Sequence, residues 1–500
     1  MTALPVLAGA ALALGGWAAA RAAARSPPRA GPALAVDLSA PLLLWLLLSL
    51  ALLRPLSAGL AVGALLAGLA VADHFKREVL REPVVFCDSA ELIELVRHPG
   101  LYLPFVGPVR VLLGMAAVAA ALALALVLEP PAFAWPAGAR WACAAAAPLL
   151  VLAVMGPLLP AAAATARALR PTGDPKADAS RLGPLATLFA YGLIARAERP
   201  AIRAALRARV AAAASSPRAA RGHLVLIQAE SFLDPRRLGL GAPPDLMPVF
   251  DRLAPLSTAG LMEAPTWGAS TIRTEFEVLT GADAASLGYD RFNPYYALTR
   301  ERLPSLAWRL RERGYRTACL HPFDRRFYGR DRVLAQLGFE MFEGAEAFAP
   351  APPGRYVSDA ALADRAEQLL RASERPTFLF LITMENHGPW APVGAGERPP
   401  GLTAYLDGVR AADALLGRMV EATAPLGGSV AFYGDHGPML DGLGAESRTD
   451  FLLHAPGRPA ARRDIRASEL GELWLDLFDR GETGRQTAPA WAAGPGGGAA

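Results

Sequence analysis

Cysteine is scarce in this chain of 500 residues, which has three: Cys87, Cys143 and Cys319. None of them belongs to a Cys-x-x-Cys pair, and Cys143 lies in a long apolar run. A disulfide framework and a structural zinc site both need several suitably spaced cysteines. The sequence therefore argues against both.

The chain also lacks a basic stripe with interleaved aromatic residues, which is the usual mark of a nucleic-acid-binding surface. Its 50 lysines and arginines against 46 acidic residues give a formal net charge of only +4. Most of the basic residues are arginines, as expected of a GC-rich genome. We therefore expect no nucleic-acid partner.

Apolar residues, by contrast, make up 53% of the chain, and the long apolar runs are concentrated before residue 165. A membrane-spanning helix needs about 20 apolar residues. Five segments fit this description, namely residues 3–20, 39–53, 56–73, 108–128 and 141–163. Residues 1–165 are therefore predicted to form an all-α transmembrane bundle of about five helices.

The first apolar segment follows Met1 and Thr2 without a preceding positive charge, so we expect an uncleaved span and not a signal peptide. Residues 166–221 contain an Ala/Arg-rich amphipathic helix, which is typical of a linker at a membrane surface. A globular domain is expected over residues 222–482. The Gly/Ala-rich tail, residues 483–500, is expected to be disordered.

The globular domain alternates short apolar strands with amphipathic helical patterns. This alternation predicts an α/β fold with a mainly parallel central sheet that is covered by helices on both faces. The strands are expected at residues 223–228, 316–320, 377–383, 429–433 and 450–454.

Four of these strands end beside residues that can bind a metal ion or move a proton. They are Glu230, His321, Glu385–His387 and Asp435–His436. Parallel sheets bind ligands at the carboxyl ends of their strands. We therefore expect these side chains to converge on one site.

The candidate nucleophile lies in residues 264–281, where a Gly-rich turn leads into a helical pattern that ends at Gly281. Thr271 is expected at the N-terminus of this helix, where backbone N–H groups attract anions. A threonine hydroxyl is a poor nucleophile until a metal ion or a base activates it. The alternative is that Ser270 or Thr271 merely caps the helix.

Together these segments resemble the sulfatase/alkaline-phosphatase superfamily, in particular its lipoteichoic acid synthase and phosphoglycerol transferase branch. The motifs are IQAES at Glu230, GASTIRTEF at Thr271 and YGDHG at Asp435 and His436. The resemblance implies that these four residues bind one divalent metal ion and that Thr271 is the nucleophile. Mostly oxygen ligands with one imidazole suit Mn²⁺, with Zn²⁺ and Mg²⁺ as alternatives.

The resemblance extends to His321 in CLHPF, Arg330 in FYGRD and His387 in ENHGPW, which it implies bind the phosphoryl group and assist catalysis. Tyr328 would join them in substrate binding, at a position where lipoteichoic acid synthases typically have Trp. Without the resemblance, the two histidines are ordinary hydrogen-bonding residues, and Arg330 pairs with Asp331 or another surface acid.

The implied activity is transfer of a phosphoglycerol-type head group from a phospholipid donor to a glycan or lipid acceptor, through a phospho-threonine intermediate. The alternatives are a phosphodiesterase or sulfuric ester hydrolase, a phosphoethanolamine transferase and a catalytically inactive membrane scaffold. Residues 270–273 lack the C/S-x-P-x-R context of a sulfatase, and the chain lacks the cysteines usual in phosphoethanolamine transferases. Within residues 222–482 there is a single Asp-His pair, Asp435-His436, which favours a one-metal site.

Two signals disagree about orientation. Arg21, Arg25 and Arg29 favour a cytoplasmic first loop, and five spans would then leave the C-terminal half in the cytoplasm. The resemblance implies a catalytic domain on the periplasmic or extracellular side of the cytoplasmic (inner) membrane. Because three arginines bias topology without fixing it, we expect a multi-pass inner-membrane protein with this external orientation.

Overall fold

The computed structural model divides the chain into two compact units, Met1–Arg199 and Pro200–Ala500. The structure describes residues 3–28, 31–101, 107–131, 162–213, 219–391, 399–440 and 446–480. The boundary between the units falls inside one helix, α9 (Pro184–Ala213), and therefore inside the segment expected to be a linker.

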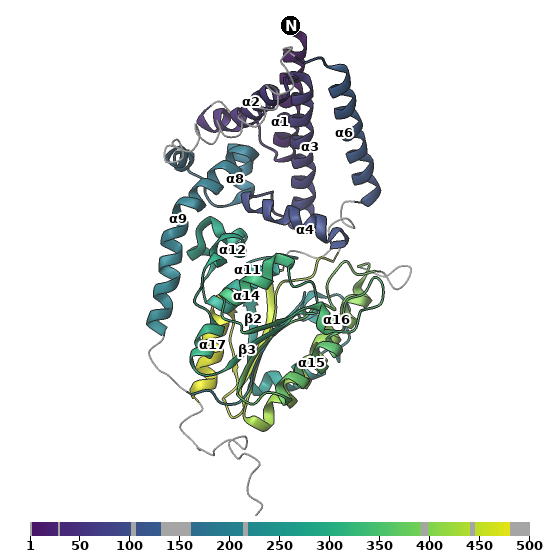
Figure 1. Cartoon of the computed structure of the whole chain (residues 1–500). Helices are drawn as coiled ribbons and strands as arrows, with labels where there is room; N and C mark the ends of the chain where they lie inside the picture. Colours follow the sequence, from purple (N-terminus) through teal and green to yellow (C-terminus); the bar gives the residue numbers. More distant parts are fainter. Residues whose placement is uncertain are drawn as a thin grey trace, which may run out of the picture. The chain divides into compact units, whose positions relative to one another are not determined.

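The first unit is helical (Figure 1). Besides the first part of α9, its helices are α1 (Ala3–Ala23), α2 (Pro32–Leu52), α3 (Pro55–Val79), η1 (Phe86–Ala90), α4 (Glu91–Arg97), α6 (Pro108–Leu128) and α8 (Pro175–Leu182). Of these, α1, α2, α3 and α6 are long and apolar enough to cross a bilayer. They match four of the five predicted spans, whereas the fifth, residues 141–163, lies almost entirely outside the described residues.

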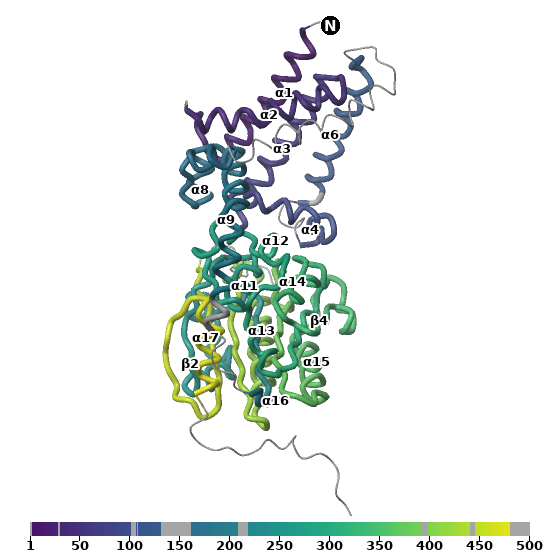
Figure 2. Tube along the Cα trace, turned by 60° about the vertical axis from the view of Figure 1, so that its left-hand side comes forward, coloured from purple at the N-terminus to yellow at the C-terminus, as the bar shows by residue number. Residues whose placement is uncertain are grey.

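Helices α1 and α3 run along each other with their backbones nearly in contact (Figure 2). A Cβ added to Gly59 of α3 would lie 2.0 Å from the carbonyl oxygen of Gly9 in α1. A Cβ added to Gly16 of α1 would lie 2.6 Å from the carbonyl oxygen of Gly63 in α3. Lipid tails pack against apolar side chains as well as a second helix does. Helix association in a bilayer therefore depends on small residues such as glycine, which let two backbones pack closely.

Asp37 of α2 is a fully buried carboxylate that joins three parts of the first unit. It accepts hydrogen bonds from the guanidinium of Arg21 at 2.6 Å and from the indole of Trp17 at 2.8 Å, both in α1. It also accepts the backbone N–H of Ala186, near the start of α9, at 2.9 Å. A buried charge needs such partners, and here they pair the Arg21 charge as well.

Among the described residues, the second unit contains one mixed sheet with the order β4-β3-β5-β1-β6-β7-β2-β8, and β9 pairs with β2. Strands β4, β3, β5, β1 and β6 are parallel, while β7 is antiparallel to both of its neighbours. The strands are β1 (Leu224–Ala229), β2 (Thr258–Glu263), β3 (Arg316–Leu320), β4 (Met341–Glu343), β5 (Thr377–Ile382), β6 (Ser429–Gly434), β7 (Arg448–His454), β8 (Ala461–Arg462) and β9 (Ile465–Arg466). All five predicted strands are present, which confirms the predicted fold class.

Helices cover both faces of this sheet (Figure 1). One layer contains α11 (Thr271–Thr280), α12 (Pro294–Ala297), α13 (Leu306–Glu312), α14 (Arg330–Gln336) and α17 (Ala467–Asp479), and the other contains α10 (Pro248–Leu253), α15 (Asp359–Arg371) and α16 (Leu402–Thr423). Short 3₁₀ helices connect them, namely η2 (Pro235–Leu238), η3 (Ala254–Leu256), η4 (Ala284–Phe292), η5 (Leu298–Arg300), η6 (Phe327–Gly329), η7 (Ala345–Ala347) and η8 (Ala424–Leu426). In β1, Leu224 and Leu226 face the first layer, and Val225 and Ile227 face the second. A strand buried on both faces has no polar side, which explains its unbroken apolar run.

The end of α9 packs on the α/β domain. Leu206 is buried in the core layer that contains α11, and Ile202 packs against the same layer. Arg203 and Arg207 both form ion pairs with Glu301 of that domain. This part of the expected linker is therefore built into the globular unit.

Candidate active site

The parallel strands β3, β5, β1 and β6 are neighbours, so their carboxyl ends meet at one edge of the sheet. Glu230 follows β1 directly, His321 follows β3, and Asp435 follows β6. His387 comes five residues after the end of β5. The edge expected from the strand pattern therefore carries all four of these residues.

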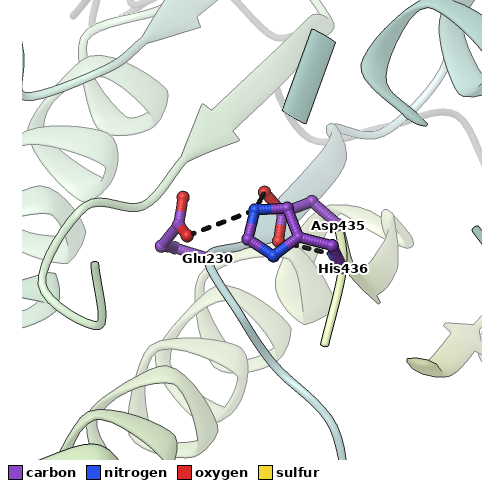
Figure 3. A group of neighbouring side chains, drawn as sticks. All are labelled: Glu230, Asp435 and His436. Atoms are coloured by element: carbon purple, nitrogen blue, oxygen red, sulfur yellow. Dashed lines mark hydrogen bonds and ion pairs between the residues drawn. The ribbon is translucent and has the colours of Figure 1, made fainter. Parts of the chain in front are cut away.

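Glu230, Asp435 and His436 form a compact buried group (Figure 3). One potential ligand atom from each lies within 4.8 Å of the others. The Nε2 atom of His436 is 3.5 Å from Oε1 of Glu230 and 3.4 Å from Oδ2 of Asp435. In the parts of the chain that the structure describes, this is the one cluster of three or more such ligands.

Thr271 is the first residue of α11, as predicted, and its Oγ1 lies 3.5 Å from Nε2 of His436. The hydroxyl of Thr274, one turn further along, donates a hydrogen bond of 2.7 Å to the carbonyl oxygen of Asp435. This bond fastens the helix to the end of β6. Ser270 makes no capping hydrogen bond with its side chain, and Gly281 ends the helix with φ of 68°.

The chemistry of this group fits a divalent cation. Oδ1 of Asp435 accepts the backbone N–H groups of Ser231 and His436, each at 2.8 Å. Its Oδ2 is buried without a hydrogen-bond partner among the described residues. Burial and the Glu230 carboxylate raise the pKa of Asp435 to about 7. Buried carboxylates in this arrangement need a proton or a cation between them.

The ring of His436 is oriented so that its Nε2 atom faces the carboxylates of Glu230 and Asp435. Its Nδ1 lies 3.1 Å from the carbonyl oxygen of Gly437, so in the neutral ring the proton on Nδ1 is donated there. The lone pair of Nε2 then faces Glu230, Asp435 and Thr271. Burial lowers the pKa of His436, but the two carboxylates outweigh this effect and raise it.

Backbone strain marks the same region. Among the described non-glycine residues of the second unit, those with positive φ are Ser231 at 53°, Ser270 at 64° and Tyr328 at 57°. Ser231 follows Glu230, Ser270 precedes Thr271, and Tyr328 lies two residues before Arg330. Such conformations cost about 1–3 kcal/mol each and persist where function requires a particular geometry.

Arg330 is almost completely buried, with 2% of its surface exposed, and it pairs with Glu275 of α11. Its Nε lies 3.2 Å from Oε1 of Glu275, and its Nη2 lies 2.8 Å from Oε2. The expected alternative of a pair with Asp331 or another surface acid is therefore wrong. The guanidinium carbon also lies 5.3 Å from the centre of the Tyr328 ring.

His321 is buried beside Arg330. Its Nδ1 lies 3.2 Å from the carbonyl oxygen of Ile382, and its Nε2 lies 3.4 Å from Nη1 of Arg330. These contacts place the proton on Nδ1 and make Nε2 an acceptor. Burial and the Arg330 charge hold the pKa of His321 well below its usual range, so the ring is neutral. A neutral ring can accept a hydrogen bond from Arg330 but carries no positive charge of its own.

His387 is partly buried and is held by Tyr356. Its Nδ1 is 2.6 Å from the carbonyl oxygen of Gly388 and 3.4 Å from the hydroxyl of Tyr356. A proton on Nδ1 satisfies the carbonyl, which makes Nε2 the nitrogen that can accept a proton. Burial and the Glu230 carboxylate raise the pKa of Tyr356 to about 12, so its hydroxyl stays protonated.

The Sulfatase family model matches residues 223–479, just over half of the chain and the whole of the site described above. The chain belongs to the sulfatase family. This match confirms the superfamily predicted from the motifs.

Two curated relatives of this sulfatase-family protein come from Rhizobium meliloti (strain 1021). The chain is 34% identical over 260 residues to the capsular polysaccharide biosynthesis protein RkpI, which covers 49% of this chain and 48% of that protein. It is 31% identical over 234 residues to a putative cyclic beta-1,2-glucan modification protein, which covers 44% and 36% respectively. The chain thus matches less than half the length of each relative.

Among solved structures, the sulfatase-family chain is similar to the Streptococcus pyogenes phosphoglycerol transferase GacH in complex with sn-glycerol-1-phosphate. The sequence identity is 20%, and the TM-score is 0.44. The likeness covers 56% of this chain and 81% of that chain.

Several residues that support the sulfatase-family site were given no role by the sequence analysis. Thr383 accepts the backbone N–H of Glu230 at 2.9 Å, and Asn386 donates to the carbonyl oxygen of Glu230 at 3.3 Å. Glu275 lies within a quoted motif but had no assigned role. The one available signal for Glu275 was its i+4 spacing from Thr271, which places both residues on the same helical face.

Proposed function

We propose that this sulfatase-family protein transfers a phosphoglycerol-type head group from a phospholipid to a glycan or lipid acceptor. The observation that carries the proposal is the position of Thr271, whose hydroxyl lies 3.5 Å from His436 in the candidate metal group. A threonine cannot become the formylglycine that a sulfatase uses. A threonine alkoxide beside a cation is suited to attack a phosphodiester.

Glu230, Thr271, Asp435 and His436 would hold a divalent ion, Mn²⁺ in our proposal with Zn²⁺ or Mg²⁺ as alternatives. When bound, the ion supplies Lewis-acid activation of the Thr271 hydroxyl and of a phosphoryl oxygen.

The protein's own residues then carry two displacements at phosphorus. Oγ1 of Thr271 attacks, the bond to the diacylglycerol oxygen breaks, and the threonine proton goes to that leaving oxygen. The acceptor hydroxyl next attacks the phospho-threonine and loses its proton to Nε2 of His387, the bond from phosphorus to Oγ1 of Thr271 breaks, and the proton held by His387 returns to Oγ1. Arg330 binds the phosphoryl oxygens throughout, and His321 and Tyr328 hold Arg330.

The names of the relatives favour a glycan acceptor, because RkpI is described with capsular polysaccharide and the second relative with a cyclic glucan. Four helices able to span a bilayer favour a donor that resides in the membrane. Together these observations support transfer from a lipid to a glycan over hydrolysis of a soluble ester.

We place the catalytic unit on the periplasmic or extracellular side of the inner membrane. The opposing signal was the arginine-rich first loop. Arg21 is buried in an ion pair with Asp37, so this charge is paired and weighs less as a cytoplasmic retention signal. Reporter fusions at residue 480 test the orientation, and activity of a cytoplasmic reporter there would contradict it.

The reaction is tested with the full chain in vesicles that contain phosphatidylglycerol labelled in its glycerol head group. Transfer predicts label on an added glycan together with release of diacylglycerol. Label that appears only as free glycerol phosphate would support a phosphodiesterase instead. Cleavage of an aryl sulfate in preference to a phosphodiester would support a sulfuric ester hydrolase, and a Thr271→Ala variant provides the blank.

A further inference from the structure

Glu275 is a completely buried carboxylate that lies one helical turn after Thr271 on α11. Its Oε1 accepts hydrogen bonds from the hydroxyl of Tyr295 at 2.5 Å and from Nε of Arg330 at 3.2 Å. Its Oε2 accepts from Nη2 of Arg330 at 2.8 Å and from Nε2 of Gln228 at 3.2 Å. Each of the two carboxylate oxygens therefore accepts two hydrogen bonds.

The two bonds to Arg330 fix the plane of its guanidinium. A two-pronged contact between arginine and carboxylate removes the rotations that a single bond would allow. Of the five guanidinium N–H groups, two are donated to Glu275 and a third faces Nε2 of His321. The other two can be donated to the oxygens of a phosphoryl group.

The same network includes residues that immediately precede the candidate metal ligands along the chain. Gln228, which donates to Glu275, is two residues before Glu230 on the chain. Its side-chain oxygen accepts the hydroxyl of Tyr433, which is two residues before Asp435. Glu275 itself is four residues after Thr271. Arg330 is thus tied through Glu275 to the three elements that carry the nucleophile and the candidate metal ligands.

From this arrangement we propose that Glu275 is a positioning residue, which holds Arg330 in the orientation that binds the transferred phosphoryl group. The proposal rests on the proposed function, in which Arg330 contacts the phosphoryl oxygens. Glu275 acts only through Arg330, so its effect on the reaction depends on Arg330 being present. A residue that merely stabilises the fold would not show this dependence.

The test is a double-mutant cycle on the full chain, loaded with Mn²⁺ in detergent, with bis(p-nitrophenyl) phosphate as a chromogenic diester. Glu275→Gln keeps the shape of the side chain and removes one prong of the contact. A displacement of about 1 Å in such a group lowers kcat/KM about 100-fold. We expect a loss of this order in the native background and, in the Arg330→Gln background, about twofold or less.

Glu277→Gln is the matched control, because Glu277 is a second buried acid on α11 that lies outside this network. It should leave kcat/KM within about twofold of the native value. Equal losses from Glu275→Gln in both backgrounds would overturn the proposal, as would full activity of the single variant. If Glu275→Gln does not fold, Tyr295→Phe removes one hydrogen bond from the carboxylate, and its smaller loss must also vanish without Arg330.

Affinity for inorganic phosphate, measured by calorimetry on the same proteins, separates this proposal from the proposed function. A native protein that neither cleaves a diester nor transfers a lipid head group would contradict the proposed function. The phosphate measurement would still apply, because Glu275→Gln should weaken phosphate binding only while Arg330 is present. If Glu275→Gln weakened phosphate binding by the same factor with and without Arg330, the positioning role would be overturned.

Discussion

At the scale of the residue, Thr271 and its neighbours form a site in which each side chain has a fixed direction. Nε2 of His436 faces the two carboxylates, and the Oδ2 atom of Asp435 has no hydrogen-bond partner among the described residues. The first turn of α11 places the hydroxyl of Thr271, the nucleophile in our proposal, beside this point. In the proposed reaction this hydroxyl forms the bond to phosphorus, so its removal should affect the chemical step and not only binding.

Thr271→Ala should lower head-group transfer by at least about 10³-fold, because removal of a nucleophile eliminates the covalent route. Thr271→Ser is the matched control, since it keeps a hydroxyl at the same helical position, and it should retain measurable transfer. Both are measured as diacylglycerol release from labelled vesicles. Equal activity of the alanine variant and the native protein would refute the assignment of Thr271.

Metal affinity should depend on pH through Asp435. Burial and the Glu230 carboxylate raise its pKa to about 7, and a cation binds only the ionised form. Below that pH, affinity should fall at least about tenfold per pH unit, because the Asp435 proton must leave for each ion that binds, and the raised pKa of His436 adds a second proton that must leave. Calorimetric titration with Mn²⁺ between pH 5.5 and 8 measures the slope. A flat profile would exclude Asp435 as a titrating ligand.

Stability should depend on pH through Glu277. Burial raises the pKa of this carboxyl from 4.5 to about 7, so the folded state keeps a proton that the unfolded chain has already lost. The stabilisation that this proton provides is complete below pH 4.5 and is lost as the pH rises to 7. Glu277→Gln should therefore gain melting temperature relative to the native protein at pH 8 and not at pH 4.5. An equal difference at both pH values would contradict the assignment.

The site could be predicted as far as chain order and local pattern determine it. Glu230, Asp435 and Thr271 could be predicted to lie close together because two strand ends and a helix start carry them. The partner of Arg330 was not found, because only packing decides which of 46 acidic residues meets a buried guanidinium. The neutral state of His321 likewise depends on burial and on Arg330, which no local pattern records.

At the scale of the element, strands were predicted where an apolar run is long enough to stand out. β2 was missed because it contains Gly260 and ends in the exposed Glu263, and β4, β8 and β9 were missed because they have only three, two and two residues. The antiparallel direction of β7 was also not predicted, since an apolar run carries no sign of direction. None of these differences affects the four parallel strands that present the site.

The close contact of α1 and α3 should tolerate no side chain at Gly59. A Cβ there would lie 2.0 Å from the backbone of Gly9, so Gly59→Leu should push the helices apart at a cost of about 1–3 kcal/mol. Gly68→Leu is the matched control on the same helix, because nothing lies within 4 Å of its added Cβ. The melting temperature of the detergent-solubilised protein should fall for Gly59→Leu and not for Gly68→Leu. Equal melting temperatures of the two variants would refute close packing of α1 and α3.

At the scale of the whole molecule, the described helices that can span a bilayer and the candidate active site lie in different units. Among the described residues, the helices that can span a bilayer precede residue 130, and the family match and the candidate site lie within residues 223–479. The second unit also has its own core, to which Leu206 of α9 contributes. Its chemistry should therefore survive separation from the membrane spans, while its access to a lipid should not.

A fragment of residues 200–482 should cleave bis(p-nitrophenyl) phosphate within about tenfold of the full chain but transfer lipid head groups from vesicles far more slowly. The anchored protein meets its donor at the high effective concentration of a shared surface, and the fragment meets it only by diffusion. A fragment that starts at residue 222 is the control, because it lacks Ile202 and Leu206 and should melt at a lower temperature. If the 200–482 fragment transferred head groups from vesicles at the rate of the full chain, the membrane spans would not be required for access to the lipid.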